Sequence, residues 1–411
     1  MNKKAKIPLL LVIIFYALYF TLTKVDWMSG DAQWFSKVDS SPISFVIKRY
    51  ETWSSRFWIE GATLIASKHL ILFYIFTVIL TLLFFYSLSE LFSFNEYDSN
   101  LVLVVFFMAL FPVVSLQSAG PIATIVNYIW PSALFLYWLM TDRHRKMKNI
   151  GSLQNSLSIL FLGLAVFNEG LAIILCLYLI LCLIVEKKNF FNTYRMICLV
   201  ISLLSFLNVL LCPGNQNRGM LEMARWFPTF NHLSFLDKIL IQFNNIASNL
   251  IVSHNLLEVL VILLFIKAIQ RRQRLSIILS GAVIMLTSAY HQLISDRLSV
   301  IVKESPEKEF NQQIIGTLLQ PTLIFATLIL LIVLIIILLY GKSKTSLMII
   351  VSIVITFSSA MAISLSPTLL ASADRPLLFL YFALVFNCIF LVNDLSEFNE
   401  RKASIIMDKS K

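Results

Sequence analysis

Hydrophobic residues occur in long runs, separated by shorter polar stretches, along nearly the whole chain. The clear runs are 7–23, 70–92, 101–116, 124–141, 194–212, 255–269, 275–292, 321–341, 345–365 and 376–395. A helix needs about 20 predominantly apolar residues to cross the hydrocarbon layer of a bilayer. The pattern therefore predicts an all-α fold, a polytopic bundle of transmembrane helices that forms one integral membrane domain over residues 1–411.

One further run, 155–186, is too long for a simple span, because a single helix of that length would measure about 47 Å. Basic residues flank it on both sides, within 143–148 and at 187–188. Basic loops favour the cytoplasm, so the chain should cross and return through two short helices that meet at Asn168 and Glu169. The alternative is one tilted helix with a buried Glu169, which would place the downstream basic loops outside.

The basic loops give about twelve crossings and place both termini in the cytoplasm. Three lysines precede the first run, and no small-residue cleavage site follows it, so we predict an uncleaved first span. The extracytoplasmic loops are then the long segments 24–69 and 213–254 and the shorter 293–320. Loops carry function more often than the elements that they join.

Composition agrees with a membrane protein. Apolar residues make up 58% of the 411 and charged residues only 14%, and the mean hydropathy is +0.81. A soluble domain carries about 25% charged residues, so too few polar side chains exist here to cover a soluble globule. The net charge of +10 lies mostly in short loops, which indicates orientation rather than nucleic-acid binding. The five cysteines lie in or beside apolar runs and have no metal-binding spacing, so we interpret them as buried small hydrophobes.

The first long loop contains the most informative motif. Arg49, Trp53, Arg56 and Glu60 recur at the spacing of one helix face, with aromatic residues around them. Such an amphipathic, aromatic-rich helix is typical of the membrane interface. Two arginines one above the other can hold a phosphate through paired donors. The alternative is a solvated face with an Arg–Glu pair.

Two carboxylates, Asp26 and Asp31, open the same loop just beyond the first span. In the second long loop, the stretch PGNQNRG at 213–219 ends the preceding helix and leaves Asn215 and Arg218 at the membrane surface. Ordinary turn chemistry is the alternative for that stretch, although an arginine beside an apolar span is an unusual turn residue.

Four smaller polar groups lie near the outer ends of predicted spans. Glu169 is a functional candidate because it is ionisable at membrane depth. The other three groups have simple structural alternatives, namely an aromatic belt or a local ion pair. They are Asn127 with Tyr128 before Trp130, His291 with Asp296 and Arg297, and Asp374 with Arg375.

Carboxylates and guanidinium groups on one face suit the transfer of a sugar from a polyprenyl phosphate. A carboxylate can act as general base on the acceptor hydroxyl, and arginine can neutralise the departing lipid phosphate. The catalytic candidates are Asp31, Asp26 and Glu169, and the substrate- or phosphate-binding candidates are Arg49, Arg56, Glu60, Tyr128, Asn168, Asn215, Arg218 and Arg375. No cofactor is indicated, and a divalent metal is compatible without being indicated. The sequence has no P-loop, GxSxG or HExxH motif to support ATP-driven or hydrolytic chemistry.

Four short motifs resemble a family of uncharacterised bacterial membrane proteins that is grouped loosely with O-antigen-type glucosyltransferases. They are RYxxWxxR at 49–56, NE at 168–169, PGNxxR at 213–218 and the late Arg375. An acidic residue after the first span and a long first outer loop also resemble membrane glycosyltransferases of the GT-C class. The resemblance implies Asp31 as the base, Asp26 as its alternate, a polyprenyl-phosphate sugar as donor and a cell-envelope glycan as acceptor. The chain departs from clear GT-C members, since it has no adjacent DD or EXD pair and no large C-terminal extracytoplasmic domain.

Other functions fit the sequence less well. A lipid-linked polysaccharide polymerase or ligase would share the donor chemistry and needs a large late outer loop, for which only 293–320 is present. A transporter or flippase of lipid-linked glycans predicts charged residues within spans and broken helices in two related halves. The sequence contains one such break, at Asn168 and Glu169, and no second copy. A scaffold without catalytic activity is the last alternative.

Overall fold

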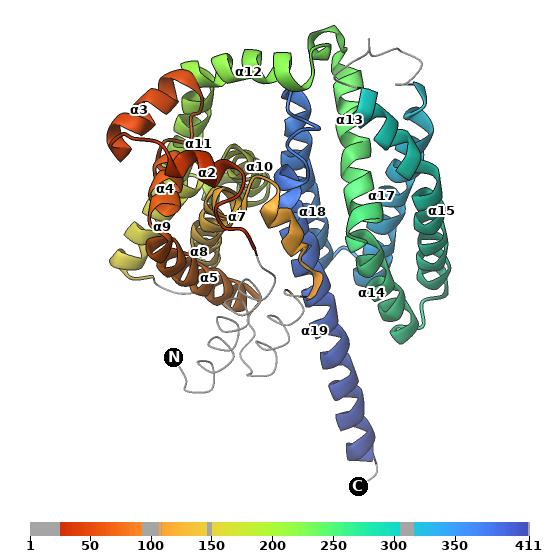
Figure 1. Ribbon diagram of the computed structural model, residues 1–411. Helices are drawn as coiled ribbons and strands as arrows, with labels where there is room; N and C mark the ends of the chain where they lie inside the picture. Colours follow the sequence, from red (N-terminus) through yellow and green to blue (C-terminus); the bar gives the residue numbers. More distant parts are fainter. Residues whose placement is uncertain (1–24, 93–106, 108, 146–149, 305–315, 410–411) are drawn as a thin grey trace. The chain divides into compact units, whose positions relative to one another are not determined.

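The computed structural model describes residues 25–92, 107, 109–145, 150–304 and 316–409. Every regular element in these ranges is a helix, as the apolar runs predict (Figure 1). The helices form two compact units. Unit 1 comprises 1–104, 113–222 and 372–378, and unit 2 comprises 105–112, 223–371 and 379–411.

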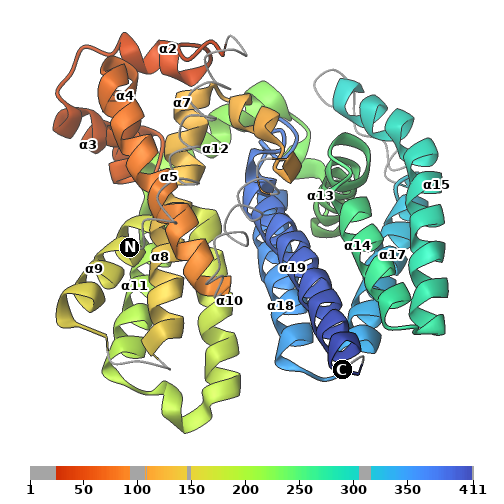
Figure 2. The same ribbon diagram turned by 90° about the horizontal axis from the view of Figure 1, so that it is seen from below.

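Helix α8 lies at the centre of unit 1, with α5 and α9 packed against it (Figure 2). Its side chains Ala133, Trp138 and Met140 are fully buried, which explains why a helix with a basic end still belongs to the core. The helices of unit 1 are α2 (Asp31–Ser36), α3 (Pro42–Thr52), α4 (Phe57–Lys68), α5 (Leu70–Phe92), α7 (Pro121–Thr124), α8 (Trp130–Arg145), α9 (Ser152–Ala165), α10 (Glu169–Glu186), α11 (Thr193–Leu211) and most of α12 (Pro213–Trp226).

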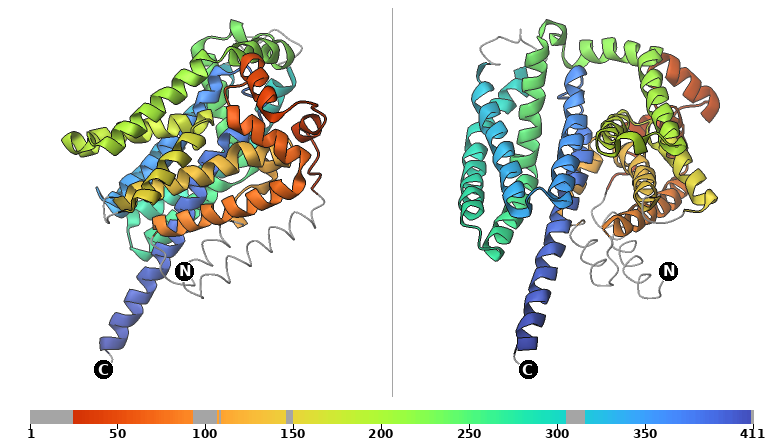
Figure 3. Two further views of the ribbon diagram at one scale, coloured as in Figure 1. Left: turned by 90° about the vertical axis from the view of Figure 1, so that its left-hand side faces the viewer. Right: turned by 180° about the vertical axis from the view of Figure 1, so that it is seen from behind.

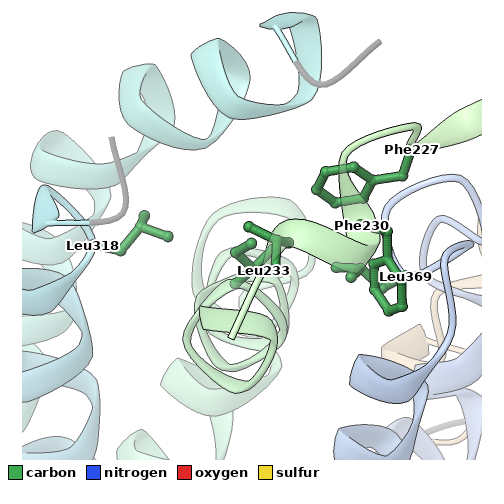
Figure 4. Packing of buried hydrophobic residues seen from close by; sticks show 6 residues of the cluster. Phe227, Phe230, Leu233, Leu318 and Leu369 are labelled. Carbon is green, nitrogen blue, oxygen red and sulfur yellow. The ribbon is translucent and has the colours of Figure 1, made fainter. Parts of the chain in front are cut away.

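Unit 2 consists of long helices, among which α15 packs against both α14 and α17 (Figure 3). Its helices are α13 (Phe235–Ser248), α14 (Leu256–Gln270), α15 (Arg274–Glu304), α17 (Leu319–Tyr340), α18 (Lys344–Met361) and most of α19 (Leu378–Lys409). Segments far apart in the sequence share one buried cluster at the start of α13, which includes Phe230, Leu233, Leu318 and Leu369 (Figure 4). This cluster closes the end of the unit where α13 and α17 begin.

Seven helices of the described residues are long and apolar enough to cross a membrane, or eight if one bent pair counts as a single span. The seven are Leu70–Leu91, Pro121–Arg145, Glu169–Glu186, Thr193–Leu211, Leu319–Tyr340, Lys344–Leu365 and Arg375–Ser396. Apolar side chains on their outer surfaces are exposed, for example Ile71 at 75% and Leu330 at 70%, where a soluble protein would present polar residues. The protein is therefore a helical, multi-pass membrane protein.

The twelve predicted crossings are not shown. The run 7–23 and residues 101–106 and 108 of the run 101–116 lie outside the described residues, and the latter run ends in a short 3₁₀ helix, Val113–Gln117. Two apolar helices, Ser152–Ala165 and Arg274–Ser288, are too short to qualify. Phe235–Ser253 and Leu256–Gln270 form the bent pair, with an angle of 67° between them.

The break predicted within 155–186 is confirmed, because α9 ends at Ala165 and α10 begins at Glu169. The return of the chain to the same membrane face stays a prediction, as does the cytoplasmic location of both termini. The two long loops are largely helical. Segment 24–69 contains α2, α3 and α4, and segment 213–254 contains α12 and α13.

Candidate functional site

The predicted helix face at 49–60 is split between two helices. Helix α3 ends at Thr52 and α4 begins at Phe57, so a turn separates Arg49 from Arg56. The expectation of one continuous helix is therefore wrong, and the turn between the two helices contacts the end of α11 and the start of α12. The Ser55 backbone N–H donates to Asn215 Oδ1 at 3.3 Å, and the Asn208 amide donates to the Ser55 carbonyl at 3.0 Å.

Gly214 allows this contact to form. A Cβ atom at that position would lie 2.3 Å from the Trp53 backbone nitrogen and 2.6 Å from the Tyr50 carbonyl oxygen. Pro213 begins α12 instead of leading into a loop, so the segment 213–218 is the first part of a helix. The preceding helix ends at Leu211, just before this stretch, as the sequence predicts. The alternative of ordinary turn chemistry is wrong, since proline at the first helical position needs no N–H partner and a helix begins here.

Arg56 connects three segments that are distant in the sequence. Its Nε donates to Glu169 Oε2 at 2.7 Å, and its second donor reaches Asn127 Oδ1 at 3.1 Å. Asn127 belongs to a π-helix, Ile125–Ile129, and such single-turn insertions occur frequently at functional sites. The two side chains of the ion pair remain about a quarter exposed, at 22% and 24%.

Asn168 holds Glu169 in place from two directions. Its Oδ1 accepts from the backbone N–H groups of Gly170 and Leu171 and so caps α10. Its Nδ2 donates to the Asn127 carbonyl at 2.8 Å. The NE pair is thus a helix cap followed by an ion-pairing carboxylate, and Asn168 itself is buried.

Electrostatics at Arg56 favour its charged form. Burial works against the charge, but the attraction of Glu169, reinforced by Tyr128 and Glu60, outweighs it and raises the pKa of Arg56 above its ordinary value. Tyr128 therefore lies close to the guanidinium. The structure brings together five predicted site residues here, which are Arg56, Tyr128, Asn168, Glu169 and Arg218.

Arg218 faces this cluster from α12 and differs from the other arginines. Within the described part of the chain, no hydrogen bond or ion pair engages its guanidinium. Burial and the nearby positive charge of Arg56 lower its pKa, and the carboxylates of Glu169, Glu60 and Glu222 offset this only partly. A half-buried guanidinium with unused donors beside a second arginine is suited to receive an anion.

Arg49 has a structural role. Its Nε and Nη2 donate to the two carboxylate oxygens of Glu60 at 3.0 and 3.3 Å, which joins α3 to α4. The guanidinium also lies 5.3 Å from the ring centre of Trp34 and 5.0 Å from that of Trp53. A bidentate pair enclosed by aromatic rings leaves Arg49 little capacity for a ligand.

Asp31 begins α2 and is fixed by a close backbone crossing. Its N–H donates to the Ala119 carbonyl at 2.9 Å. Gly30 and Gly120 meet there with φ of 61° and 86°, and a Cβ on Gly120 would lie 2.1 Å from the Ser29 carbonyl oxygen. Only glycine adopts this geometry without strain.

The Asp31 side chain is exposed, and no hydrogen bond or ion pair to its carboxylate occurs among the described residues. Desolvation by the surrounding protein nevertheless raises its pKa, and the nearby cations Arg375 and Arg49 oppose the rise only in part. Glu60 contributes to the electrostatics of Asp31, of Arg56 and of Arg218, so all three lie in one neighbourhood.

Arg375 lies near Asp31, in the short segment that precedes α19. Its Nε donates to the Ser372 carbonyl at 3.1 Å, and the adjacent Asp374 accepts a hydrogen bond from the Ser115 hydroxyl. Asp26, in contrast, is a turn residue, since its Oδ1 accepts from the Met28 N–H at 3.1 Å. The side chains of the remaining candidates, His291, Asp296 and Arg297, lie outside the described residues.

A second charged cluster in unit 1 was not foreseen. Arg195 pairs with Asp142 at 2.9 Å and with Glu186 at 3.2 Å, and the Tyr178 hydroxyl donates to Asp142 at 2.6 Å. Arg195 and Asp142 are only 3% and 2% exposed, so the cluster ties α8, α10 and α11 together internally. The available signal was Asp142 within an otherwise basic segment.

Unit 2 contains a similar cluster. The fully buried Lys267 pairs with Asp394 at 2.8 Å, and the Tyr340 hydroxyl donates to the same carboxylate at 2.6 Å. In the described residues, His, Cys, Asp and Glu side chains form no group of three or more that could hold a metal ion.

The chain matches none of the family models, curated proteins or solved structures with which it was compared. Its functional assignment therefore depends on the geometry of its own residues. That geometry belongs to a helical polytopic membrane protein with an Arg56–Glu169 ion pair, an unengaged Arg218 and an accessible Asp31 in one unit.

Proposed function

We propose that this protein is a membrane glycosyltransferase that moves a sugar from a polyprenyl-phosphate donor to a cell-envelope glycan on the extracytoplasmic face. The observation that carries the proposal is the presence in unit 1 of two unengaged side chains of opposite charge. The Asp31 carboxylate and the Arg218 guanidinium lack hydrogen-bonding partners among the described residues, and both lie within electrostatic reach of Glu60.

Asp31 serves as the general base in this proposal. A base works best when its pKa lies closer to the working pH, provided that it stays ionised. Desolvation shifts the Asp31 pKa upward, in that direction. Its exposure leaves room for an acceptor hydroxyl, whose proton the carboxylate takes as the oxygen attacks the sugar.

Arg218 receives the lipid phosphate that departs. Charge on that phosphate grows as the bond to the sugar breaks, so a positioned guanidinium stabilises the transition state more than the ground state. Arg56 adds to the positive field and is held by Glu169 and Asn127. Glu169 is thus assigned to hold Arg56 rather than to act as a base.

The test compares cells that lack the protein with cells that carry single variants. We expect Asp31→Asn and Arg218→Ala each to reproduce the loss of the envelope glycan seen on deletion. The matched controls Asp39→Asn and Arg225→Ala remove the same charges at exposed positions nearby and should leave the glycan unchanged. Wild-type glycan with both site variants, at equal membrane levels, would contradict the proposal.

A polymerase or ligase would use the same donor chemistry and differ in its acceptor. The length distribution of the glycan separates it from a transferase, because losing a polymerase shortens the chains and losing a transferase removes one type of residue from them.

One observation favours transport as a second candidate. The bent pair in unit 2 has a π-helix, Asn249–Ser253, at its break, so a second interrupted helix exists that the sequence did not reveal. Amide side chains lie before and at the break, where the half-buried Asn245 donates to the buried Gln242 and the half-buried Asn249 donates to Asn245. Broken helices with polar groups are typical of transporter sites.

Proteoliposomes distinguish the two candidates. A transporter would move a fluorescent polyprenyl-phosphate sugar between leaflets, would lose this activity on Gln242→Leu, and would keep it on Asp31→Asn. A transferase predicts the opposite dependence, with Asp31 required for transfer to an added acceptor.

A further inference from the structure

Helix α12 has two chemically distinct sides. Asn215, Arg218 and Glu222 recur at intervals of three and four residues and form a polar side. Met220, Leu221 and Ala224 form an apolar side. The second half of α12 is therefore amphipathic, whereas Gln216 and Asn217, earlier in the helix, are polar and exposed.

The polar side of α12 faces the protein. The Asn215 amide donates to Ser55 Oγ at 3.1 Å, and Gly214 lies against the backbone of the α3–α4 turn. Arg218 lies beside Arg56 and Glu169, and Glu222 is close to Arg218. These contacts fix the rotation of the helix about its axis.

The apolar side is consequently directed outward. Met220 is 61% exposed and Leu221 is 60% exposed. An amphipathic helix on a water-soluble protein does the reverse, because its polar side faces solvent and its apolar side faces the core. The orientation of α12 is that of a helix whose outer surroundings are not water.

We propose that α12 lies in the lipid–water interface of the bilayer, with Met220 and Leu221 in the hydrocarbon and Arg218 on the opposite side against the Arg56–Glu169 ion pair. This inference concerns the membrane surface and does not depend on the proposed transferase activity.

Lipid is favoured over a second protein chain because the exposed apolar surface continues that of the preceding span. Leu210 and Leu211, at the end of α11, are 69% and 70% exposed, and only Cys212 separates α11 from α12. The span thus ends where the interfacial helix begins. At the other end, the Arg225 guanidinium lies 4.7 Å from the Trp226 ring centre, and these two residue types are both common anchors at headgroup level.

The location of α12 also sets the depth of Arg218. Interfacial helices embed their apolar faces about 5–10 Å into the boundary between headgroups and acyl chains. Arg218 is carried by such a helix, so its guanidinium lies near the level of lipid phosphates.

The test uses the full chain in bilayer nanodiscs, with an environment-sensitive fluorophore attached to Met220→Cys or Leu221→Cys. Leu207→Cys, on the exposed surface of α11, serves as the lipid reference, and Asp39→Cys serves as the aqueous reference. The labelled wild-type chain corrects for its own cysteines, four of which are buried. Lipids brominated in the acyl chain and aqueous iodide are the two quenchers.

We expect brominated lipid to quench the probes at 220 and 221 as strongly as the probe at 207, and iodide to quench mainly the probe at 39. Quenching of 220 and 221 by iodide, to the extent seen at 39, would overturn the proposal. Protection from both quenchers would also overturn it, because a protein partner would then cover this side.

A measurement without labels covers the case in which the cysteine variants fail to fold. The fluorescence difference between the wild-type chain and Trp226→Phe isolates the signal of Trp226. Brominated lipid should remove most of that difference, and an unchanged difference would contradict the interfacial location of α12.

Discussion

At the scale of single residues, three arginines of unit 1 differ in the partners of their guanidinium groups. Arg49 is engaged by Glu60 and by aromatic rings, Arg56 is engaged on one side by Glu169, and Arg218 is unengaged within the described residues. The sequence predicts which residues gather, since short motifs place them at the ends of apolar runs. It does not predict which arginine is free, because the partners of Arg56 come from segments 71 and 113 positions away.

The titration of Asp31 provides a prediction at this scale. Its pKa is raised by desolvation and held back by Arg375, so Arg375→Ala should raise the Asp31 pKa further. A water-soluble carbodiimide modifies protonated carboxyl groups, and mass spectrometry across a pH series reports the midpoint for each residue. We expect Arg375→Ala to move the midpoint of Asp31 to higher pH, and an unchanged midpoint would contradict the electrostatic interaction of the two residues.

The raised pKa of Asp31 also determines how this residue affects the stability of the fold at different pH values. A carboxyl group whose pKa is higher in the folded state than in the unfolded state favours folding at acidic pH. That contribution is lost as the pH rises through the unfolded-state pKa and then the folded-state pKa, and the ionised group opposes folding. Asp31→Asn should therefore melt no lower than wild type at neutral pH, even though it removes the proposed base. A clearly lower melting temperature would indicate that Asp31 is a structural residue.

The Arg56–Glu169 contact can be tested with a double-mutant cycle. Groups joined by a charge-assisted hydrogen bond usually show a coupling energy of about 0.5–3 kcal/mol. We expect Arg56→Ala and Glu169→Ala to destabilise the chain by less in combination than the sum of their separate effects. Unfolding by a denaturing detergent in mixed micelles gives the energies, and additive effects would mean that the pair contributes nothing.

At the scale of elements, helix interruptions were predictable where a local signal exists and not where packing causes them. The break before α10 follows from Asn168, a good N-cap residue that precedes a carboxylate. The turn between α3 and α4 packs against Gly214 and Asn215. Asn215 is 160 positions away from its partner Ser55 in the sequence, so no local signal marks the turn. Similarly, Asp142 directly follows one apolar run and Arg195 lies at the start of another, and only tertiary packing buries them together.

Two glycines on α12 provide the element-scale prediction. Gly214→Ala places a Cβ against the Trp53 backbone and should destabilise the chain by about 1–3 kcal/mol through forced displacement. Gly219→Ala, five residues later, meets no atom within 4 Å and should stabilise the helix by about 0.5–1 kcal/mol. Thermal unfolding of both variants measures the contrast, and equal effects would contradict the close contact of α12 with the α3–α4 turn.

At the scale of the whole molecule, hydropathy predicted the described spans well, because every one of the seven coincides with an apolar run. The described residues show seven or eight of the predicted crossings, and run lengths do not reveal that a helix bends or ends early. The helix interruption at Asn249–Ser253 in unit 2 was also not predicted from the sequence, because a π-helix preserves the apolar pattern around it. The exposed apolar surfaces of both units agree with a bilayer environment.

Membrane sidedness is the prediction that belongs to this scale. Gln216 and Gly151 are exposed positions, and the basic loops predict that they lie on opposite faces. A membrane-impermeant maleimide should label Gln216→Cys in intact cells and Gly151→Cys only after permeabilisation. The reverse pattern would place the Arg56–Glu169 site in the cytoplasm and exclude an extracytoplasmic reaction.

The central claim is that Asp31 and Arg218 act together on a polyprenyl-phosphate sugar. The most direct measurement reconstitutes the purified full chain in liposomes with a radiolabelled polyprenyl-phosphate hexose and envelope glycan from the deletion strain, and follows the release of polyprenyl phosphate. The account predicts release by the wild type and by Asp39→Asn, and a loss of about 10²–10⁴-fold for Asp31→Asn, the range typical of removing a general base. Equal release by Asp31→Asn and wild type would contradict it.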